Sequence, residues 1–208
     1  MASHLPAAGL LLFQGDSITA AKREADIPSD LGRGYVRRVA HALADTHPDL
    51  QVVNRGVSGN RAADLAERWQ NDTLALKPQL VSVLIGVNDT WRRFDRDDPT
   101  SVTAYEQSYR RILALSADQN SRLVLVEPFL LPVRAEQWAW REDLDARIAV
   151  VRRLAWEFNA PFLAADGLLN QAACDYGGAA ALTDDGVHLN DAGHSVLAQA
   201  WLELVAGP

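Results

Sequence analysis

The sequence predicts a three-layer α/β/α sandwich built around a parallel five-stranded sheet. Short apolar runs alternate with amphipathic helical patterns along the 208 residues, which is typical of βαβ units. The apolar runs are continuous rather than alternating, as expected for strands that are buried on both faces of a sheet. Because no linker, repeat or charge block interrupts this pattern, we expect one domain that spans residues 1–208.

Five short apolar runs are expected to form the strands. Their lengths suit strands rather than helices, which need longer periodic patterns. In chain order the runs are Leu10–Phe13, Leu50–Val53, Leu80–Ile85, Leu123–Val126 and Phe162–Ala164. With helices between successive strands, we expect the flavodoxin-like strand order 2-1-3-4-5.

The segments between these runs carry a helical period. In the first of them, apolar residues recur at i, i+3, i+4 and i+7 from Val36 to Leu43. The expected helices are Tyr35–Thr46, Ala62–Leu76, Val102–Ala117, a helix of about three heptads that ends near Phe158, and Asp191–Val205. Asn190 or Asp191 is expected to cap the last helix. The stretch between the fifth strand and Asp184 is expected to be irregular.

Composition and charge exclude several classes of protein. Twenty Lys and Arg residues against 27 Asp and Glu residues give a net charge of −7, which disfavours nonspecific binding to nucleic acid or anionic membranes. The single Cys174 excludes an internal disulfide framework and is expected to be a small buried residue. The N-terminal apolar run is too short for a signal peptide or a membrane span, so the expected location is the cytoplasm.

Small polar residues follow each expected strand at its carboxyl end. In parallel sheets of this kind those ends form one edge, and ligands bind outside it. We therefore expect the five segments that follow the strands to meet there. They are Gly15–Thr19, Asn54–Asn60, Gly86–Asp89, Glu127–Phe129 and Asp184–His188.

Three of these residues have the chemistry of acyl transfer. Ser17 begins a helix-like turn after a buried strand, where free N–H groups and the helix dipole favour developing negative charge. A serine there is equally typical of a helix N-cap. His188 lies three residues after Asp185, so the carboxylate can hold Nδ1–H and leave Nε2 to take a proton from Ser17. Alternatively, Asp185 is a turn residue and His188 lies at the edge of the core.

An acyl-transfer site also needs donors for the oxyanion. The candidates are the backbone N–H groups of Ser17 and Gly59 and the side-chain amide of Asn88. Gly59 could instead belong to a plain turn, and Asn88 could cap the following helix. The sequence contains no phosphate loop, dinucleotide-binding loop or nucleophile elbow, and no His or Cys pair spaced for a metal. No metal and no cofactor are expected.

Together these segments resemble the four blocks of the SGNH, or GDSL-type, hydrolase superfamily. The blocks occur in the family's order as Gly15–Ser17, Gly56–Asn60, Gly86–Asp89 and Asp185–His188. A finer likeness is to intracellular bacterial acetylxylan esterases and related carbohydrate deacetylases. It is carried by Asn54–Asn60, Ile85–Arg92 and Glu127–Phe129.

The resemblance implies the SGNH hydrolase fold and a cofactor-free serine esterase that removes O-acetyl groups from sugars or xylo-oligosaccharides. It implies Ser17, Asp185 and His188 as the catalytic triad. It implies Ser17, Gly59 and Asn88 as the oxyanion hole. The expected partners are a small acetylated sugar or oligosaccharide and further copies of the chain in a homo-oligomer, with no nucleic acid and no membrane. The alternatives are a short-chain lysophospholipase or thioesterase of the same superfamily, and a non-catalytic carbohydrate-binding scaffold.

Four residues are expected near the substrate: Asp16, Trp91, Arg92 and Trp140. Trp91 and Arg92 follow Asn88, where an aromatic face can pack on sugar C–H groups, although core packing is an equal alternative for Trp91. Asp16 is also expected to brace the turn that carries Ser17. Trp140 lies in the segment after the fourth strand, which could arch over the site or join a subunit contact. Because no block carries a long apolar insertion, a short acyl group is favoured.

Overall fold

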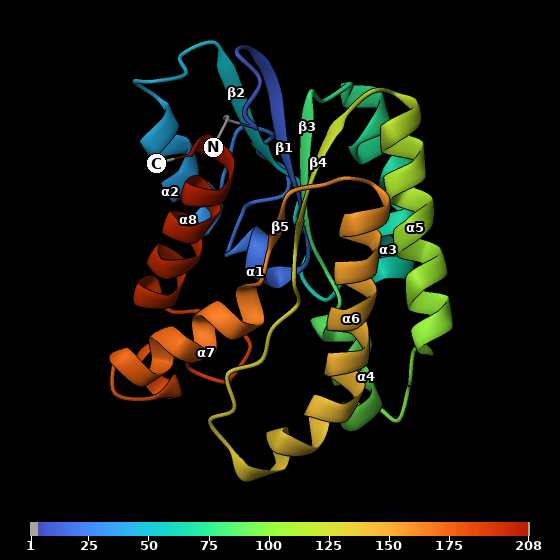
Figure 1. Cartoon of the computed structure of the whole chain (residues 1–208), viewed down its shortest axis with the longest axis vertical. Coiled ribbons are helices and arrows are strands. Elements are labelled where there is room, and N and C mark those ends of the chain that lie inside the picture. The colour runs from blue at the N-terminus through green and yellow to red at the C-terminus, as the bar shows by residue number, and fades with distance from the viewer. Residues whose placement is uncertain (1–3, 208) are drawn as a thin grey trace.

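A parallel five-stranded sheet forms the centre of the computed structural model, which describes residues 4–207 (Figure 1). The strands lie in the order β2-β1-β3-β4-β5, and every neighbouring pair is parallel. Their bounds are β1 Gly9–Gly15, β2 Leu50–Asn54, β3 Leu80–Leu84, β4 Arg122–Val126 and β5 Phe162–Leu163. The predicted sheet and strand order are therefore confirmed.

Helices cover both faces of this sheet, which confirms the predicted three-layer sandwich (Figure 1). One face carries α2 (Tyr35–Leu43) and α8 (Asp191–Ala206), and the other carries α3 (Ala62–Asp72), α5 (Val102–Asp118) and α6 (Arg141–Glu157). The shorter helical segments are α1 (Ser17–Ala20), α4 (Val87–Asp95), α7 (Ala165–Asp175), η1 (Leu74–Leu76), η2 (Ala135–Trp140) and η3 (Ala179–Ala181).

Strand β3 shows why the strands appear in the sequence as continuous apolar runs. Leu80 and Leu84 belong to the apolar cluster that includes residues of α2 and α8. Val81 and Val83, which point to the opposite face, belong to the cluster that includes residues of α3, α5 and α6. Because both faces of the strand are covered, every one of its positions is buried.

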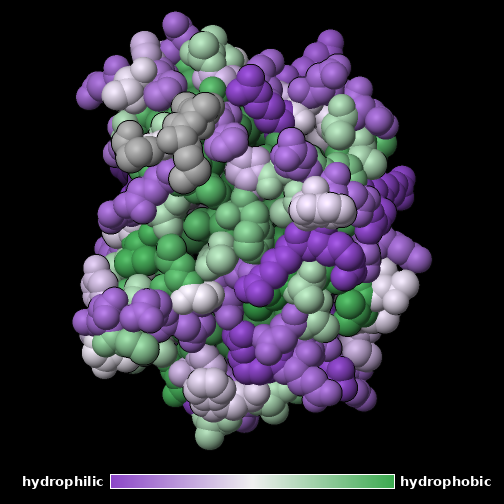
Figure 2. All heavy atoms as spheres, viewed as in Figure 1, coloured by the Kyte–Doolittle hydropathy of each residue, from purple (hydrophilic) through white to green (hydrophobic). Residues whose placement is uncertain are grey.

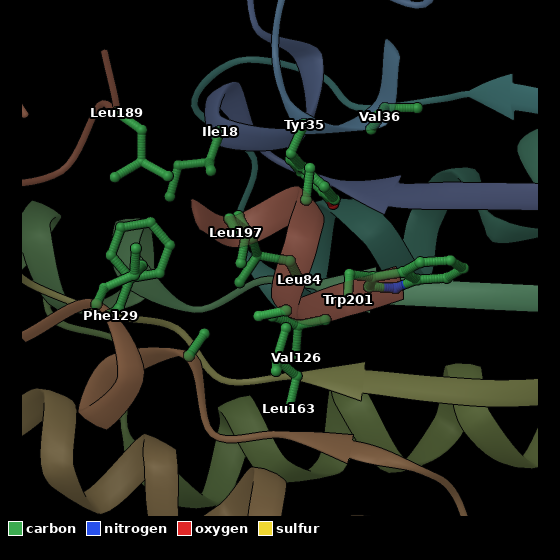
Figure 3. Packing of buried hydrophobic residues seen from close by; sticks show 14 of the residues in the cluster. Ile18, Tyr35, Val36, Leu84, Val126, Phe129, Leu163, Leu189, Leu197 and Trp201 are labelled. Carbon is green, nitrogen blue, oxygen red and sulfur yellow. The ribbon is translucent and has the colours of Figure 1, made fainter. Parts of the chain in front are cut away.

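The last helix closes onto the centre of the sheet. Trp201 of α8 is fully buried, and its indole N–H donates to Ser82 Oγ of β3 at 2.9 Å. The same indole lies against Phe13 of β1, with 5.0 Å between the ring centroids. Figure 3 shows Trp201 in this cluster together with Leu84 and Val126 from neighbouring strands. Helix α8 therefore packs on the two central strands, β1 and β3.

The helix predicted over residues 62–76 is interrupted at Thr73. Beyond this residue the chain forms the 3-10 turn η1, which ends at Lys77 in the left-handed conformation with φ of 50°. The residue before a proline is disfavoured in the right-handed helical region. Because Lys77 precedes Pro78, the chain leaves the helix here, as the sequence indicated, but it does so in two steps.

The ends of α2 and α8 were predicted with different success. Asn190 caps α8, since its Oδ1 accepts hydrogen bonds from the N–H groups of Ala192 and Gly193 at 3.0 and 3.1 Å. This settles the choice between the two candidate caps. Helix α2 ends at Leu43, earlier than the predicted Thr46.

Helix α7 was not predicted from the sequence. Gly167 lies within its first turn, and the N-cap residue Ala164 makes no side-chain hydrogen bond, so the segment lacks the usual local helix signals. The Asp166 N–H donates instead to Oε2 of Glu127 at 3.2 Å. Leu169 and Ala173 bury one face of the helix. Cys174, one position further on, turns away from that face and is exposed, so the expectation that it is a buried residue is wrong.

The surface is mixed in polarity. On the face shown in Figure 2, polar residues predominate and apolar residues gather near the middle, between α8 and α6. The tryptophans differ widely in exposure: Trp69 and Trp201 are fully buried, whereas Trp156 of α6 is 86% exposed. Over residues 4–207, no helix is both long enough and apolar enough to cross a bilayer.

Candidate active site

The site lies beyond the carboxyl ends of the strands. Helix α1 begins just after β1, and both α1 and α4 lie at this end of the sheet in Figure 1. The loop Asp185–His188 reaches the same place from far along the chain, because Ser17 Oγ lies 2.9 Å from His188 Nε2. The structure therefore brings Ser17 and His188 together, as the sequence predicted.

Ser17 is the first residue of α1, and its hydroxyl bonds to His188. The helix cap is the preceding residue, since Asp16 Oδ1 accepts a hydrogen bond from the Ile18 N–H at 2.9 Å. The alternative in which Ser17 itself is the N-cap is therefore wrong. The Ser17 hydroxyl is left available for the imidazole of His188.

Asp185 organises its own turn and also holds the histidine. Its Oδ1 accepts hydrogen bonds from the N–H groups of Val187 and His188 at 2.9 and 2.7 Å. Its Oδ2 lies 2.6 Å from His188 Nδ1. When the imidazole is neutral with its proton on Nδ1, facing the carboxylate, Nε2 carries the lone pair that faces Ser17. Asp185 is therefore both a turn residue and the hydrogen-bond partner of His188, so the two sequence-based interpretations are compatible.

Asp185 and His188 shift each other's pKa. Partial burial acts to raise the pKa of Asp185, but hydrogen bonds from the His188 ring and from two backbone N–H groups outweigh it and lower this pKa to about 2. The hydrogen bond to Asp185 raises the pKa of His188 above its usual 6.5, against partial burial. The buried Asp16 adds to this increase and Arg92 opposes it. The pair is thus stabilised in its charged form.

Apolar residues next to Ser17 and His188 anchor both in the core. Ile18 and Leu189 are 1% and 7% exposed and belong to the same cluster as Phe129, which follows β4. Figure 3 shows Ile18 and Leu189 turned towards each other, with Phe129 close by. Packing between the residues that follow the serine and the histidine therefore holds the two polar side chains at hydrogen-bonding distance.

Gly59 lies on a loop that is tied to the end of β1. The Val57 N–H donates to the Gly15 carbonyl at 3.1 Å, which brings the loop beside the turn that carries Ser17. Gly59 is exposed and has φ of +83°, and a Cβ at this position would have no atom within 4 Å. The residue therefore lies in a turn and is also accessible to a ligand.

Asn88 is the second residue of α4 and is buried, at 2% exposed. Gly86 precedes the helix as its N-cap, so the alternative in which Asn88 is the cap is wrong. Asn88 Nδ2 donates to the Asn60 carbonyl at 3.1 Å, and Arg92 Nη2 donates to Asn88 Oδ1 at 3.2 Å. These two bonds fix the amide orientation. Because an amide nitrogen carries two N–H groups, the second one remains available to a ligand.

Arg68 connects the loops of the site, and sequence reasoning missed it. From α3 its Nη2 donates to the Gly15 carbonyl at 3.2 Å and its Nε donates to Asn60 Oδ1 at 2.7 Å. Its Nη1 pairs with Asp72 at 2.9 Å. The guanidinium therefore joins the end of β1 to the loop that holds Gly59. Only the i,i+4 pairing with Asp72 was visible in the sequence.

Two buried carboxyl groups lie beneath the surface of the site. Asp16 and Asp89 are 1% and 0% exposed, and burial raises the pKa of Asp16 to about 7 and that of Asp89 to about 6. Asp89 Oδ2 accepts a hydrogen bond from the Ala62 N–H at the start of α3, at 3.1 Å. Because Asp16 is covered and caps α1, it braces the turn, and the expectation that it contacts substrate is corrected.

An aromatic cluster borders His188. The Trp91 ring lies 5.8 Å from the imidazole and 5.7 Å from the Trp140 ring, between centroids. Trp140 in turn stacks on Phe94 at 5.5 Å. Trp140 is only 6% exposed, so it supports the other rings from behind, which corrects its expected place among the substrate contacts. Phe94 is 40% exposed, and Trp91 is half-buried.

Comparison with known proteins identifies the family. The model of the GDSL-like Lipase/Acylhydrolase family matches residues 13–196, a range that contains Ser17, Asn88 and His188. The chain belongs to this family. It is a GDSL-type carboxylic ester hydrolase.

Among curated relatives, this GDSL-type hydrolase is similar to the acetylxylan esterase of Geobacillus stearothermophilus. The two are 36% identical over 203 residues, which cover 92% of this chain and 91% of that esterase. The esterase TesA of Pseudomonas aeruginosa is 37% identical over 86 residues, 41% of this chain and 40% of TesA. The hydrolase is therefore acetylxylan esterase-like over nearly its whole length.

Solved structures agree with this assignment. An α/β hydrolase enzyme from the metagenome of Lake Arreo is 33% identical and has a TM-score of 0.91 over 99% of both chains. The Geobacillus stearothermophilus acetylxylan esterase is 34% identical and has a TM-score of 0.88 over 97% of this GDSL-type chain and 96% of that chain. Similar structures also include catalytic mutants of that esterase in which a serine, a histidine or an aspartate is replaced by alanine.

Proposed function

We propose that the chain removes O-acetyl groups from sugars or xylo-oligosaccharides through an acyl-enzyme on Ser17. The observation that carries this proposal is the series of hydrogen bonds from Ser17 Oγ to His188 Nε2 (2.9 Å) and from His188 Nδ1 to Asp185 Oδ2 (2.6 Å). A nucleophile, a general base and an orienting carboxylate have this arrangement. The 36% identity to an acetylxylan esterase supports an acetylated sugar as substrate.

In the proposed acylation step, Ser17 Oγ attacks the acetyl carbonyl carbon while His188 Nε2 takes the hydroxyl proton. The carbonyl opens to a tetrahedral oxyanion, which collapses and breaks the bond to the sugar oxygen. That oxygen leaves with the proton from His188. A water molecule then gives a proton to His188 and attacks the acyl carbon. The bond from this carbon to Ser17 Oγ breaks, Oγ takes the proton from His188, and acetate is released. Asp185 stays ionised and orients the imidazole throughout.

The proposed oxyanion hole consists of the Ser17 and Gly59 backbone N–H groups and the Asn88 amide. Asn88 suits this role because its Oδ1 faces Arg92 and one N–H faces the Asn60 carbonyl, which holds the second N–H in a fixed direction. Donors that are oriented before the reaction stabilise developing charge without reorganisation. In this scheme Arg92 orients Asn88, and its predicted contact with the substrate stays a prediction.

The aromatic surface beside His188 is the proposed contact for the sugar. Trp91 lies against the imidazole that protonates the leaving oxygen, and the ring of Phe94 is 40% exposed. Ring faces pack well on the C–H groups of a sugar. The net charge of −7 also suits a neutral sugar ester better than an anionic polymer.

A panel of esters tests the substrate class. We expect the highest kcat/KM for acetyl among acetyl, butyryl and octanoyl aryl esters, and loss of acetyl mass from acetylated xylo-oligosaccharides. Preference for the octanoyl ester would support the lysophospholipase or thioesterase alternative instead. No turnover of any ester by the folded protein would support the non-catalytic scaffold.

Self-association of the chain stays a prediction from the resemblance. Size-exclusion chromatography with light scattering measures the mass in solution and compares it with that of one chain. A mass equal to that of one chain at micromolar concentration would contradict it.

A further inference from the structure

The segment between β4 and α6 passes across the carboxyl end of the sheet and touches the Asp185–His188 loop. We call residues 128–140 the strap; in Figure 1 it is the yellow segment that runs from β4 to the start of α6. Its first part is firmly seated, since Phe129, Leu130 and Leu131 are 0% exposed. The Leu131 N–H donates to the Gly186 carbonyl at 2.8 Å, so the strap bonds directly to the loop that carries Asp185 and His188.

Gln137 makes the second connection between the strap and this loop. It lies in η2 and is 0% exposed. Its Oε1 accepts hydrogen bonds from the N–H groups of Val133 and Arg134 at 2.9 and 3.1 Å. Its Nε2 donates to the Asp185 carbonyl at 2.6 Å. One buried side chain thus closes the turn of the strap and holds the backbone of Asp185.

A neutral amide supplies both the acceptor and the donor that these three bonds need. The Val133 and Arg134 N–H groups need an acceptor, and the Asp185 carbonyl needs a donor. A glutamate at position 137 would keep the acceptor but would place a carboxylate against the Asp185 carbonyl. A methionine of similar length would supply neither group and would leave buried polar atoms without partners.

Gly186 allows this close approach. Its φ is +91°, a conformation that favours glycine, and a Cβ there would lie 2.6 Å from Gln137 Nε2. The peptide between Asp185 and Gly186 is therefore pressed against the Gln137 amide. Its carbonyl accepts from that amide and its N–H donates to Thr183 Oγ1, while the Leu131 bond holds the following Gly186–Val187 peptide.

The orientation of this peptide decides where the Asp185 carboxylate points. Asp185 Oδ2 faces His188 Nδ1 only while Oδ1 stays on the N–H groups of Val187 and His188. Thr183 completes the turn, since its Oγ1 accepts from the Gly186 N–H at 3.0 Å and donates to the His188 carbonyl at 2.7 Å. A twist of the Asp185–Gly186 peptide would move the carboxylate away from Nδ1.

We propose that Gln137 is a positioning residue of the esterase reaction, which holds the Asp185–Gly186 peptide so that the Asp185 carboxylate stays aligned on His188. The inference rests on the catalytic roles proposed above for Asp185 and His188. Gln137 itself touches neither substrate nor the reacting atoms. It acts through the loop.

The test compares Gln137→Met and Gln137→Glu with the control Glu136→Gln, an exposed neighbour in the same turn. With an aryl acetate as probe, we expect kcat to fall by about 10- to 100-fold in both Gln137 variants, because small misplacements of catalytic groups cost that much. KM should change by less than about twofold, since no substrate contact is lost. The acid limb of the kcat/KM profile should move to lower pH, because a misaligned carboxylate raises the pKa of His188 less, while Asp16 and Arg92 still act on it.

Two further measurements separate positioning from a merely structural role. Thermal unfolding identifies which of the two variants keeps a melting temperature close to that of the wild type, and the kinetics of that variant are decisive. In an Asp185→Asn background, Gln137→Met should lower kcat by less than about twofold further, since both act through one group. Full additivity of the two effects, or a fall in kcat with an unmoved acid limb, would overturn the proposal.

The kinetics of the Asp185→Asn and Gln137 variants also distinguish failure of this inference from failure of the proposed function. If Asp185→Asn lowers kcat and the Gln137 variants do not, only the positioning role is wrong. If Asp185→Asn leaves the rate unchanged, the proposed triad is wrong, and the role of Gln137 falls with it.

Discussion

The two halves of the site are built in different ways. The nucleophile half, named for the proposed role of Ser17, also contains Gly59 and Asn88 and lies on segments that follow the adjacent strands β1, β2 and β3. The acid–base half, with Asp185 and His188, lies far beyond β5 on a loop without a strand of its own in the sheet. Its position depends on Thr183, on the strap and on packing of Leu189 in the core.

This difference shows that one site can depend on two kinds of support. Strand register places the nucleophile half, and Arg68 and Arg92 hold its loops from neighbouring helices. Side-chain contacts place the acid–base half, so a single substitution outside the triad can misalign it. We therefore expect the two halves to respond differently to mutation and to pH.

The largest effect is expected for Ser17→Ala, which removes the proposed nucleophile. We expect kcat for an aryl acetate to fall by at least about 10⁴-fold, because the other groups cannot replace a missing nucleophile. Thermal stability should stay nearly unchanged, since the lost hydroxyl contributes little to the core. The control is Ser29→Ala, an exposed loop serine. More than a few percent of wild-type activity in Ser17→Ala would mean that the nucleophile is another residue.

A smaller effect is expected for Asn88→Ala, which weakens the nucleophile half alone. Loss of one oxyanion donor should lower kcat by about 10²- to 10³-fold. The acid limb of the pH profile should stay in place, because the Asp185–His188 pair is untouched. Steady-state kinetics and a pH series test this against Asn71→Ala, an exposed asparagine of α3. A variant that retains full kcat would remove Asn88 from the oxyanion hole.

The smallest effect is the pH dependence of the acid–base half. His188 must be neutral to accept the Ser17 proton, and its pKa is raised above 6.5 by Asp185. As pH falls below this raised pKa, the imidazole becomes protonated, and kcat/KM should fall by about tenfold per pH unit. In Asp185→Asn the acid limb of the kcat/KM profile should move to lower pH. A wild-type limb with its midpoint below 6.5 would contradict the raised pKa.

Much of the fold and of the site geometry could be predicted because the relevant signals are local. Ser17, Gly59 and Asn88 follow apolar runs within a few residues, and Asp185 and His188 share one short turn. Parallel strands bring the segments with Ser17, Gly59 and Asn88 to one edge. The meeting of Ser17 with His188 was expected from their acyl-transfer chemistry and from the resemblance to the four family blocks.

The remaining features depend on contacts between distant residues. Gln137 reaches Asp185 across 48 positions, and Arg68 reaches Gly15 across 53, with no motif to mark either contact. The burial of Asp16 and Trp140 was also not predicted from the sequence, because both lie beside residues that are accessible. Helix α7 was not predicted because Gly167 lies in its first turn and the Asp166 N–H donates to Glu127, 39 positions away, rather than to a local cap.

The packing of α8 on β1 and β3 has a consequence for synthesis of the protein. A growing chain exposes Phe13 and the other residues of the central strands until the segment with Trp201 has left the ribosome. His188 is made just before this helix, so the proposed base and the cover of the core arrive together. A nascent chain released earlier would therefore carry Ser17 without its proton acceptor and with an open apolar face, a state prone to aggregation. The proposed base and the helix that covers Phe13 therefore belong to the same short stretch of the chain.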